Sequence, residues 1–280
     1  MNEESLKTNK YADVPLRVRS WVVIIVIFSL AVLHPILMNL FICFLSFWGM
    51  KEFLSMYNFY NKKTAVLLFL FLIPEYFSLY SKNYFDFILY TSLFAISFGI
   101  YTIFIKNKIS KKRGLLVSLG IFLCTFSIGH LSFIYNIHFP FSNMIGVYIL
   151  ILLVVPTELN DVFQYLTGKA FGKTKITPVI SPNKTLEGFL GGLVLTIFLC
   201  NLLGFILLPE RSFLFYSLLG ILIGILGFFG DIFMSYIKRN AGVKDTGNLI
   251  PGHGGLLDRI DSLMFITPIY YWLIFYYLIA

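Results

Sequence analysis

Long apolar runs separated by short polar segments occupy most of this 280-residue chain. Most runs approach the roughly 20 residues that an α-helix needs to cross the bilayer core. A helix suits a membrane because it satisfies all of its backbone hydrogen bonds within one segment. The sequence therefore predicts an all-α, polytopic membrane protein, a helical bundle with about nine transmembrane helices, at residues 21–33, 35–48, 64–79, 85–105, 115–134, 143–155, 189–208, 212–229 and 262–279.

The amino-acid composition supports the same class. Apolar residues make up 58% of the chain and charged residues only 13%, whereas a soluble domain carries about 25% charged residues. The spans leave no room for a separate soluble domain. Cys43, Cys124 and Cys200 all lie inside apolar runs without a Cys-x-x-Cys pattern, so we expect them to be core residues.

The first two runs are short, and His34-Pro35 lies between them. This dipeptide indicates a tight turn in a helical hairpin; the alternative is one helix kinked at Pro35, which gives eight spans. With nine spans and a cytoplasmic N-terminus, all of the 22 Lys and Arg residues except Lys82 and Arg211 fall on the cytoplasmic side. This asymmetry favours nine spans. The net charge of +8 then reflects topology and lipid headgroups, and we expect no nucleic-acid partner.

One dense polar cluster, residues 230–261, interrupts the apolar pattern near the C-terminus. Charged side chains beside a membrane are expensive and indicate a functional site. Carboxylates can hold a metal cation, and Lys or Arg can bind phosphate oxygens. The alternative is an ordinary charged cytoplasmic loop, but the interleaved glycines argue against it. The cluster contains Asp231, Lys238, Arg239, Lys244, Asp245, His253, Asp258, Arg259 and Asp261.

Spacing within the cluster suggests which side chains converge. Asp258 and Asp261 are three residues apart, on one face of the last helix, and with Asp231 they could supply oxygen ligands to Mg²⁺. The alternative is that they only complement the helix dipole. Lys238 follows Asp231 by seven residues, two helical turns along the same face. For Arg239, anchoring at the membrane surface is an equal alternative to substrate binding.

An upstream segment, SPNKTLEG at residues 181–188, precedes a predicted helix starting near Thr185. Its Ser181, Asn183 and Glu187 could simply cap that helix. The functional interpretation places the helix N-terminus and Lys184 at an anionic phosphate. Further upstream, Asn160 and Asp161 end an apolar helix that begins near residue 143, where Asp161 could bind metal or nucleotide or pair with a basic side chain.

These segments resemble a known family. The run SYIKRNAGVKDTGNLIPGHGGLLDRID, residues 235–261, is similar to the signature of phosphatidate cytidylyltransferases, the CDP-diacylglycerol synthases. ELNDVFQY at 158–165 and SPNKTLEG extend the similarity over residues 156–261, whereas residues 1–155 are similar only in hydropathy and layout. We therefore expect an N-terminal region of six spans, residues 1–155, and a catalytic membrane region, residues 156–280. Gln164-Tyr165 departs from the commoner Ala-Tyr, which leaves room for a divergent lipid acceptor.

The resemblance implies transfer of CMP from CTP to phosphatidate, giving CDP-diacylglycerol and pyrophosphate at the cytoplasmic face of a bacterial-type inner membrane. It implies Mg²⁺ as cofactor, with a second cation left open, and membrane lipids and a homodimer as partners. The candidate metal ligands are Asp231, Asp258 and Asp261; the candidate catalytic residues are Lys238, Lys244, Asp245, His253 and Arg259; the candidate substrate-binding residues are Asn160, Asp161, Ser181, Asn183, Lys184, Glu187 and Arg239.

Two alternatives stay open from the sequence. A related CTP-dependent enzyme could act on another lipid phosphate or on a lipid alcohol. A cation-coupled transporter is more remote, because transporters show paired repeats with charges near mid-membrane.

Overall fold

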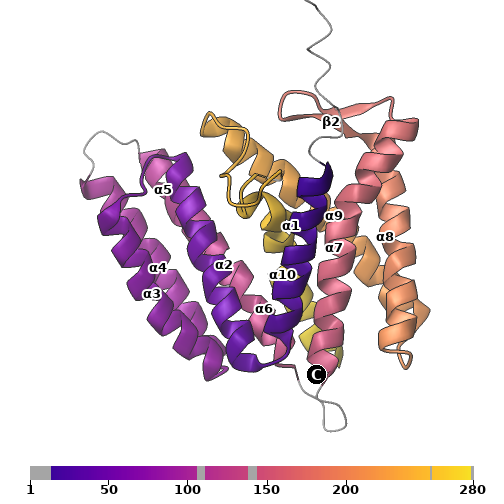
Figure 1. The fold of residues 1–280 in the computed structure, drawn as a ribbon, viewed down its shortest axis with the longest axis horizontal. Helices are drawn as coiled ribbons and strands as arrows, with labels where there is room; N and C mark the ends of the chain where they lie inside the picture. Colours follow the sequence, from indigo (N-terminus) through magenta and orange to yellow (C-terminus); the bar gives the residue numbers. More distant parts are fainter. Residues whose placement is uncertain (1–13, 106–110, 138–143, 253, 279–280) are drawn as a thin grey trace, which may run out of the picture.

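The computed structural model describes residues 14–105, 111–137, 144–252 and 254–278, and helices dominate it (Figure 1). The helices are α1 (Val14–Val32), α2 (Pro35–Met56), α3 (Lys62–Tyr80), α4 (Tyr84–Ile105), α5 (Lys111–Phe122), the π-helix η2 (Leu123–Ser127), α6 (Ile128–Tyr135), α7 (Ile145–Phe171), α8 (Leu186–Leu207), α9 (Phe213–Asn240) and α10 (Leu257–Leu278). One short antiparallel hairpin, β1 (Lys175–Thr177) and β2 (Ser181–Thr185), pairs Lys175 with Thr185.

The helices confirm a multi-pass α-helical membrane protein. Seven of them are long and apolar enough to cross a membrane, counting α5, η2 and α6 as the continuous run Gly114–Tyr135. The apolar part of α1, Arg19–Val32, is shorter than the others, and α10 is not among the seven. With these two included, the helical segments in the described residues match the nine expected from the sequence.

The first two helices form a hairpin, as predicted, and not one kinked helix. His34 is the N-cap of α2: its backbone is extended, and its side-chain Nδ1 accepts a hydrogen bond from the Ile36 amide at 3.2 Å. Pro35 takes the first helical position, where its missing N–H is not needed. Figure 1 shows α1 and α2 side by side, joined at the lower end of the bundle.

The two motif segments contain more helix than expected. α7 continues past Pro156 to Phe171, beyond the end that the sequence predicted at Asn160 and Asp161, and the boundary expected at residue 155 falls inside this helix. The reason is that side chains beyond Pro156 pack on other helices: Asn160, for example, accepts a hydrogen bond from Thr196 of α8 at 3.0 Å. α9 likewise continues to Asn240. Asp231 and Lys238 therefore belong to one continuous helix, which their placement on one face requires.

Small residues bring α9 close to its neighbours, as the spacing of Gly220, Gly224, Gly227 and Gly230 in the sequence predicts. A Cβ atom on Gly220 would lie 2.6 Å from the Ile197 Cα of α8, and one on Gly230 would lie 3.2 Å from the Ser262 Cα of α10. The shorter distance leaves no room for a side chain at Gly220, and the longer one is tighter than an ordinary van der Waals contact. The close approach at Gly230 places the next residue, Asp231, beside the start of α10.

Both motif segments lie at one end of the bundle. In Figure 1 the β-hairpin and the loop between α9 and α10 are at the upper end, together with the start of α1, and the turn between α8 and α9 is at the lower end. A hydrogen bond of 2.9 Å from the Ser20 hydroxyl of α1 to the Pro251 carbonyl ties that loop to α1. The charged side chains of both segments therefore share one end.

Candidate active site

Two lysine–aspartate pairs join the motif segments. Lys184 of β2 lies 2.5 Å from Asp231 of α9, measured from Nζ to Oδ2, and Lys238 of α9 lies 2.8 Å from Asp258 of α10. The Lys184 ammonium also lies 4.8 Å from the centre of the Phe228 ring. The two ion pairs thus join the hairpin, α9 and α10, so charged side chains of both motif segments meet at one end of the bundle.

A pocket opens beside the Lys184–Asp231 pair. Its volume is about 190 Å³, below the roughly 300–1,000 Å³ typical of small-molecule pockets, so it has room for only part of a nucleotide or lipid. Helices α7, α8 and α9 and strand β2 supply its walls. The lining combines four of the predicted substrate-binding residues with two aromatic rings: Asp161, Gln164, Tyr165, Ser181, Asn183, Lys184, Thr185, Gly188, Phe189 and Asp231.

Three carboxylates interact next to this pocket. The pKa of Asp261, which lies just before the apolar part of α10, is raised well above its usual value by burial first and then by the carboxylates of Asp231 and Asp161, whereas Lys238 lowers it. Asp161 of α7 interacts electrostatically with Lys184 and Arg259. This concentration of negative charge in a buried place is what a bound cation would relieve.

The chemistry of this donor set fits Mg²⁺, which prefers carboxylate oxygens and completes its shell with water and phosphate. Among the described residues no group of three side chains already surrounds a single metal position. The positive charges that lie beside Asp231 and Asp258 are the ammonium groups of Lys184 and Lys238. The assignment of Asp231, Asp258 and Asp261 as ligands therefore stays a prediction.

Asp258 also organises the loop before α10. One of its oxygens accepts the hydrogen bond from Lys238, and the other accepts from the Thr246 amide at 2.9 Å, the Thr246 hydroxyl at 3.1 Å and the Gly255 amide at 3.0 Å. Burial alone would raise the pKa of Asp258, but the hydrogen bonds and charge of Lys238 and the two amides hold it below its usual value. Asp258 is thus an anion with every oxygen engaged.

Arg259 follows Asp258 on α10 and interacts with α7. Its charge acts on Glu158 and Asp161, both on α7. Its Nε atom is buried and has no hydrogen-bond partner among the described residues. A buried guanidinium N–H without a partner is expensive, so this side chain is suited to a substrate oxygen.

Two predicted substrate-binding residues, Asn160 and Glu187, do not line the pocket and make contacts that support the fold. The Asn160 side chain is buried between Thr196 of α8 and Gly227 of α9. Glu187 accepts hydrogen bonds from the Lys173 and Thr174 amides and so fixes the start of the hairpin. The N-cap of α8 is Thr185, whose side chain accepts from the Gly188 amide, so Ser181 and Asn183 do not cap this helix.

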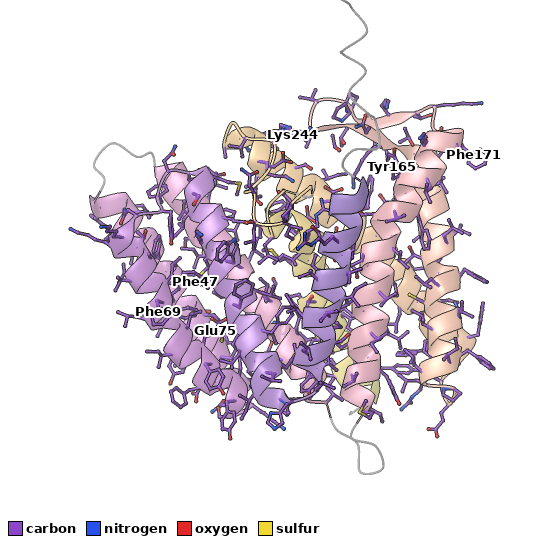
Figure 2. All side chains as sticks on the ribbon, in the orientation of Figure 1. Phe47, Phe69, Glu75, Tyr165, Phe171 and Lys244 are labelled. Atoms are coloured by element: carbon purple, nitrogen blue, oxygen red, sulfur yellow. The ribbon has the colours of Figure 1, made fainter. Side chains whose placement is uncertain are left out.

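The remaining predicted residues lie in or near the α9–α10 loop. Arg239 is exposed and donates to the Val243 carbonyl at 3.1 Å, which closes the end of α9. Lys244 and Asp245 are exposed on the loop, where Figure 2 labels Lys244. His253 lies outside the described residues.

One residue of the site escaped the sequence analysis. Glu52, near the end of α2, is 5% exposed, and its carboxylate accepts hydrogen bonds from the Leu256 and Leu257 amides at the start of α10. A carboxylate inside a largely apolar run, which needs partners, was the signal that could have found it.

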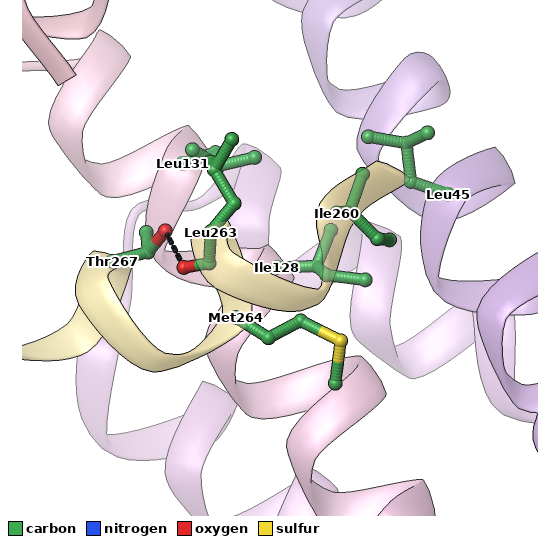
Figure 3. A pocket seen from close by; sticks show the side chains of 7 residues that line it. All are labelled: Leu45, Ile128, Leu131, Ile260, Leu263, Met264 and Thr267. Carbon is green, nitrogen blue, oxygen red and sulfur yellow. Dashed lines mark hydrogen bonds between the residues drawn. The ribbon is translucent and has the colours of Figure 1, made fainter. Parts of the chain in front are cut away.

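A second cavity has different chemistry. It lies between α2, α6 and α10 and measures about 10 Å³ (Figure 3). Its lining is apolar except for Thr267, whose hydroxyl donates to the Leu263 carbonyl at 2.6 Å. This is a small packing gap and not a substrate site.

Comparison with known proteins identifies relatives over most of the chain. A chain from Escherichia coli (strain K12), the uncharacterized protein YnbB, is 38% identical over 280 residues, covering 97% of this chain and 90% of the relative. The phosphatidate cytidylyltransferase of Bacillus subtilis (strain 168) is 32% identical over 211 residues, 75% of this chain and 76% of the relative. That of Staphylococcus haemolyticus is 36% identical over 180 residues, 64% of this chain and 66% of the relative.

A family model also matches almost the whole chain. The model of the cytidylyltransferase family aligns with residues 15–277, which includes α1 to α6 as well as the motif segments. An enzyme is thereby favoured over the transporter alternative. The chain belongs to the cytidylyltransferase family and is a membrane nucleotidyltransferase.

Proposed function

We propose that this enzyme transfers CMP from CTP to phosphatidate, giving CDP-diacylglycerol and pyrophosphate. The supporting observation is the pocket beside Lys184 and Asp231, which continues into the carboxylates of Asp161 and Asp261 and the cation of Arg259. Both substrates carry phosphates, and a site with interleaved cations and carboxylates suits two polyanions and a metal ion.

The reaction needs little from the protein beyond positioning and charge. An oxygen of the phosphatidate phosphate attacks the α-phosphorus of CTP; the new P–O bond forms as the bond to the β-phosphate breaks and pyrophosphate leaves. The attacking phosphate oxygen is already anionic, so no activated serine or cysteine is required. Lys184, Lys238 and Arg259 would hold phosphate oxygens, and their positive charge would stabilise the leaving pyrophosphate.

Asp231, Asp258 and Asp261 would hold Mg²⁺. When bound, the ion would neutralise triphosphate charge and polarise the reacting phosphate. The ammonium groups of Lys184 and Lys238 would then be free to exchange their carboxylate partners for phosphate oxygens. That exchange is the proposed role of the two ion pairs.

The test is to incubate purified protein with labelled CTP, Mg²⁺ and a panel of lipid phosphates and lipid alcohols. Transfer of label from the α-phosphate to phosphatidate supports the proposal, and an Asp231→Asn variant is the matched negative control. Transfer of the γ-phosphate to a lipid alcohol would identify a kinase and contradict it.

A second acceptor has its own supporting observation. Gln164 lines the pocket, and its Nε2 atom is buried with no hydrogen-bond partner among the described residues. A polar group in this place can select an acceptor that carries an extra hydroxyl or carbonyl. A lipid phosphate other than phosphatidate is therefore the second candidate, and the same panel distinguishes the two.

We further propose that the site faces the cytoplasm of the bacterial inner membrane, where CTP is available. Single cysteines at Asn136 and Lys244 should react with a membrane-impermeant reagent from opposite sides. The native Cys43, Cys124 and Cys200 are buried and are not expected to interfere. Reaction of both positions from one side would contradict the nine-span orientation.

A further inference from the structure

The carboxylate of Glu52 has an unusual set of partners. One oxygen accepts from the Trp48 indole at 3.1 Å and the Leu256 amide at 3.0 Å; the other accepts from the Leu257 amide at 2.8 Å and the Thr246 hydroxyl at 2.9 Å. All four partners are donors, which is the pattern of an ionised carboxylate. Neither ion pair found among the described residues involves Glu52.

Three of these donors belong to the segment between α9 and α10, about 200 residues away in sequence. The Leu256 and Leu257 amides are at the N-terminus of α10, where backbone N–H groups lack helical partners. Leu256 itself has no side-chain acceptor to cap the helix. Glu52 of α2 takes the place of an N-cap and meets the positive end of the helix dipole.

The motif glycines make room for this carboxylate. A Cβ atom on Gly247 would lie 2.8 Å from the nearer Glu52 oxygen, and one on Gly255 would lie 2.5 Å from the other. At either distance the Glu52 carboxylate would have to move to admit a side chain. Glu52, on α2 and outside the signature, thus accounts for the glycine at Gly247, whereas Gly255 is also crowded by the Thr246 hydroxyl and the Gly247 amide nitrogen.

The Thr246 hydroxyl connects Glu52 to the proposed chemistry. It lies 2.9 Å from Glu52 and 3.1 Å from Asp258, and it has one proton to share between these two carboxylates. Lys238 on the far side of Asp258 offsets the repulsion between the two anions. A shift of Glu52 would therefore move Thr246, the start of α10 and Asp258 together.

We propose that Glu52 is a positioning residue for cytidylyl transfer: it holds the start of α10 so that Asp258 and Arg259 keep their orientation toward substrate. This inference rests on the proposed function of Asp258. A displacement of about 1 Å in a positioned group can lower a rate about 10²-fold, so the effect should appear in kcat more than in the KM for CTP.

The experiment compares Glu52→Gln, Glu52→Asp and Thr246→Val with Glu75→Gln in the full-length protein. Glu75 is the matched control, because it is a fully buried glutamate in α3 that accepts from Ser46 at 2.8 Å, and Figure 2 shows it far from the loop that carries Lys244. The readouts are kcat, KM for CTP and hydrogen exchange of peptides covering residues 246–257.

We expect Glu52→Gln to lower kcat at least tenfold, to change KM less, and to speed exchange in residues 246–257. Glu52→Asp should lie between it and wild type, and Glu75→Gln should leave both readouts unchanged. Wild-type exchange and kcat in Glu52→Gln would overturn the proposal. If that variant does not fold, Thr246→Val decides: unchanged exchange and kcat there would overturn it equally.

The two hypotheses fail in distinguishable ways. If the wild-type protein transfers no CMP, the proposed function fails, while the exchange data still report whether Glu52 holds the start of α10. If transfer occurs but exchange and kcat do not respond to Glu52, only the positioning role fails.

Discussion

The two lysine–aspartate pairs of the site have the same chemistry in different surroundings. The side chains of Lys184 and Asp231 are 14% and 25% exposed, and those of Lys238 and Asp258 are 11% and 5% exposed. Asp231 has one further donor, the Ser235 hydroxyl at 3.2 Å, whereas Asp258 has three contacts from Thr246 and Gly255. The first pair borders a pocket. The second pair joins α9 to α10, and its Asp258 also binds the loop between these helices.

The same lysine–aspartate pairing can therefore serve either substrate binding or structural stability. In the first pair the Asp231 carboxylate is partly exposed and has only one other hydrogen bond within the described part of the chain, so it can exchange its partner for substrate or metal. A buried pair with many hydrogen bonds cannot lose one member without leaving the other charge uncompensated. We therefore expect the Lys184–Asp231 pair to act mainly in binding and chemistry, and the Lys238–Asp258 pair to support the structure as well.

The largest effect should follow from Asp258→Asn. It removes a proposed metal ligand, which should lower the rate by at least about 10²-fold, and it leaves Lys238 buried without its partner, which typically costs about 3–5 kcal/mol. Thermal unfolding in detergent and labelled-CTP turnover would measure both. A variant with wild-type unfolding temperature would show that this pair is no more structural than the other.

Asp231→Asn should have a similar effect on rate but a smaller effect on stability. Its carboxylate is partly exposed, but its loss leaves the buried Lys184 ammonium unpaired, so we expect a loss of unfolding free energy smaller than that of Asp258→Asn, while turnover falls about 10²–10³-fold. The same two assays apply. Strong destabilisation by this substitution would remove the contrast between the pairs, and full activity at limiting Mg²⁺ would contradict the proposed metal ligand.

Gln164→Ala tests the pocket beside the exposed pair. Loss of one hydrogen bond to an acceptor typically costs about 0.5–1.5 kcal/mol, so we expect about a three- to tenfold loss with the preferred lipid. The loss should be smaller for lipids without the recognised group. The measurement is the ratio of kcat/KM values over the lipid panel, and equal losses for every lipid would argue against a role in selectivity.

Arg239→Ala should have the smallest effect, although Arg239 adjoins Lys238. Its side chain is exposed and closes the end of α9 through the Val243 carbonyl, and surface substitutions usually change stability by about 0.5 kcal/mol or less. Turnover should stay within about twofold of wild type, measured by the same CTP assay. A large loss would mean that the substrate reaches beyond Lys238 to this surface.

The sequence predicted the site where spacing along one helix was sufficient. Asp231 and Lys238 share a face of α9 because seven residues make two turns, and the helix does extend to Asn240. Lys184 was assigned to an anion from its place before α8, and it lies on the pocket. The sequence was less informative about Asn160 and Glu187, since both types of side chain can bind substrate or backbone with equal ease.

The N-terminal half shows the limit most clearly. From residues 1–155 the sequence predicted only spans and orientation, yet Glu52 contacts the motif segment directly. Nothing in local periodicity connects α2 with α10, because the contact depends on how the helices pack. The length of α7 was missed for a related reason: packing on α8 and α9 stabilises helix beyond Asn160 and Asp161, where the sequence suggested its end.

By itself, the sequence determined the membrane class, the hairpin at His34-Pro35, the close packing of α9 and the identity of the charged side chains. These follow from hydropathy, backbone restriction and the absence of a Cβ atom, which are properties of short segments. Only the tertiary structure decided which carboxylate meets which cation, which of the two pairs is buried, and that a glutamate from α2 caps α10. Those outcomes depend on distances between segments far apart in the chain, and burial sets their energies.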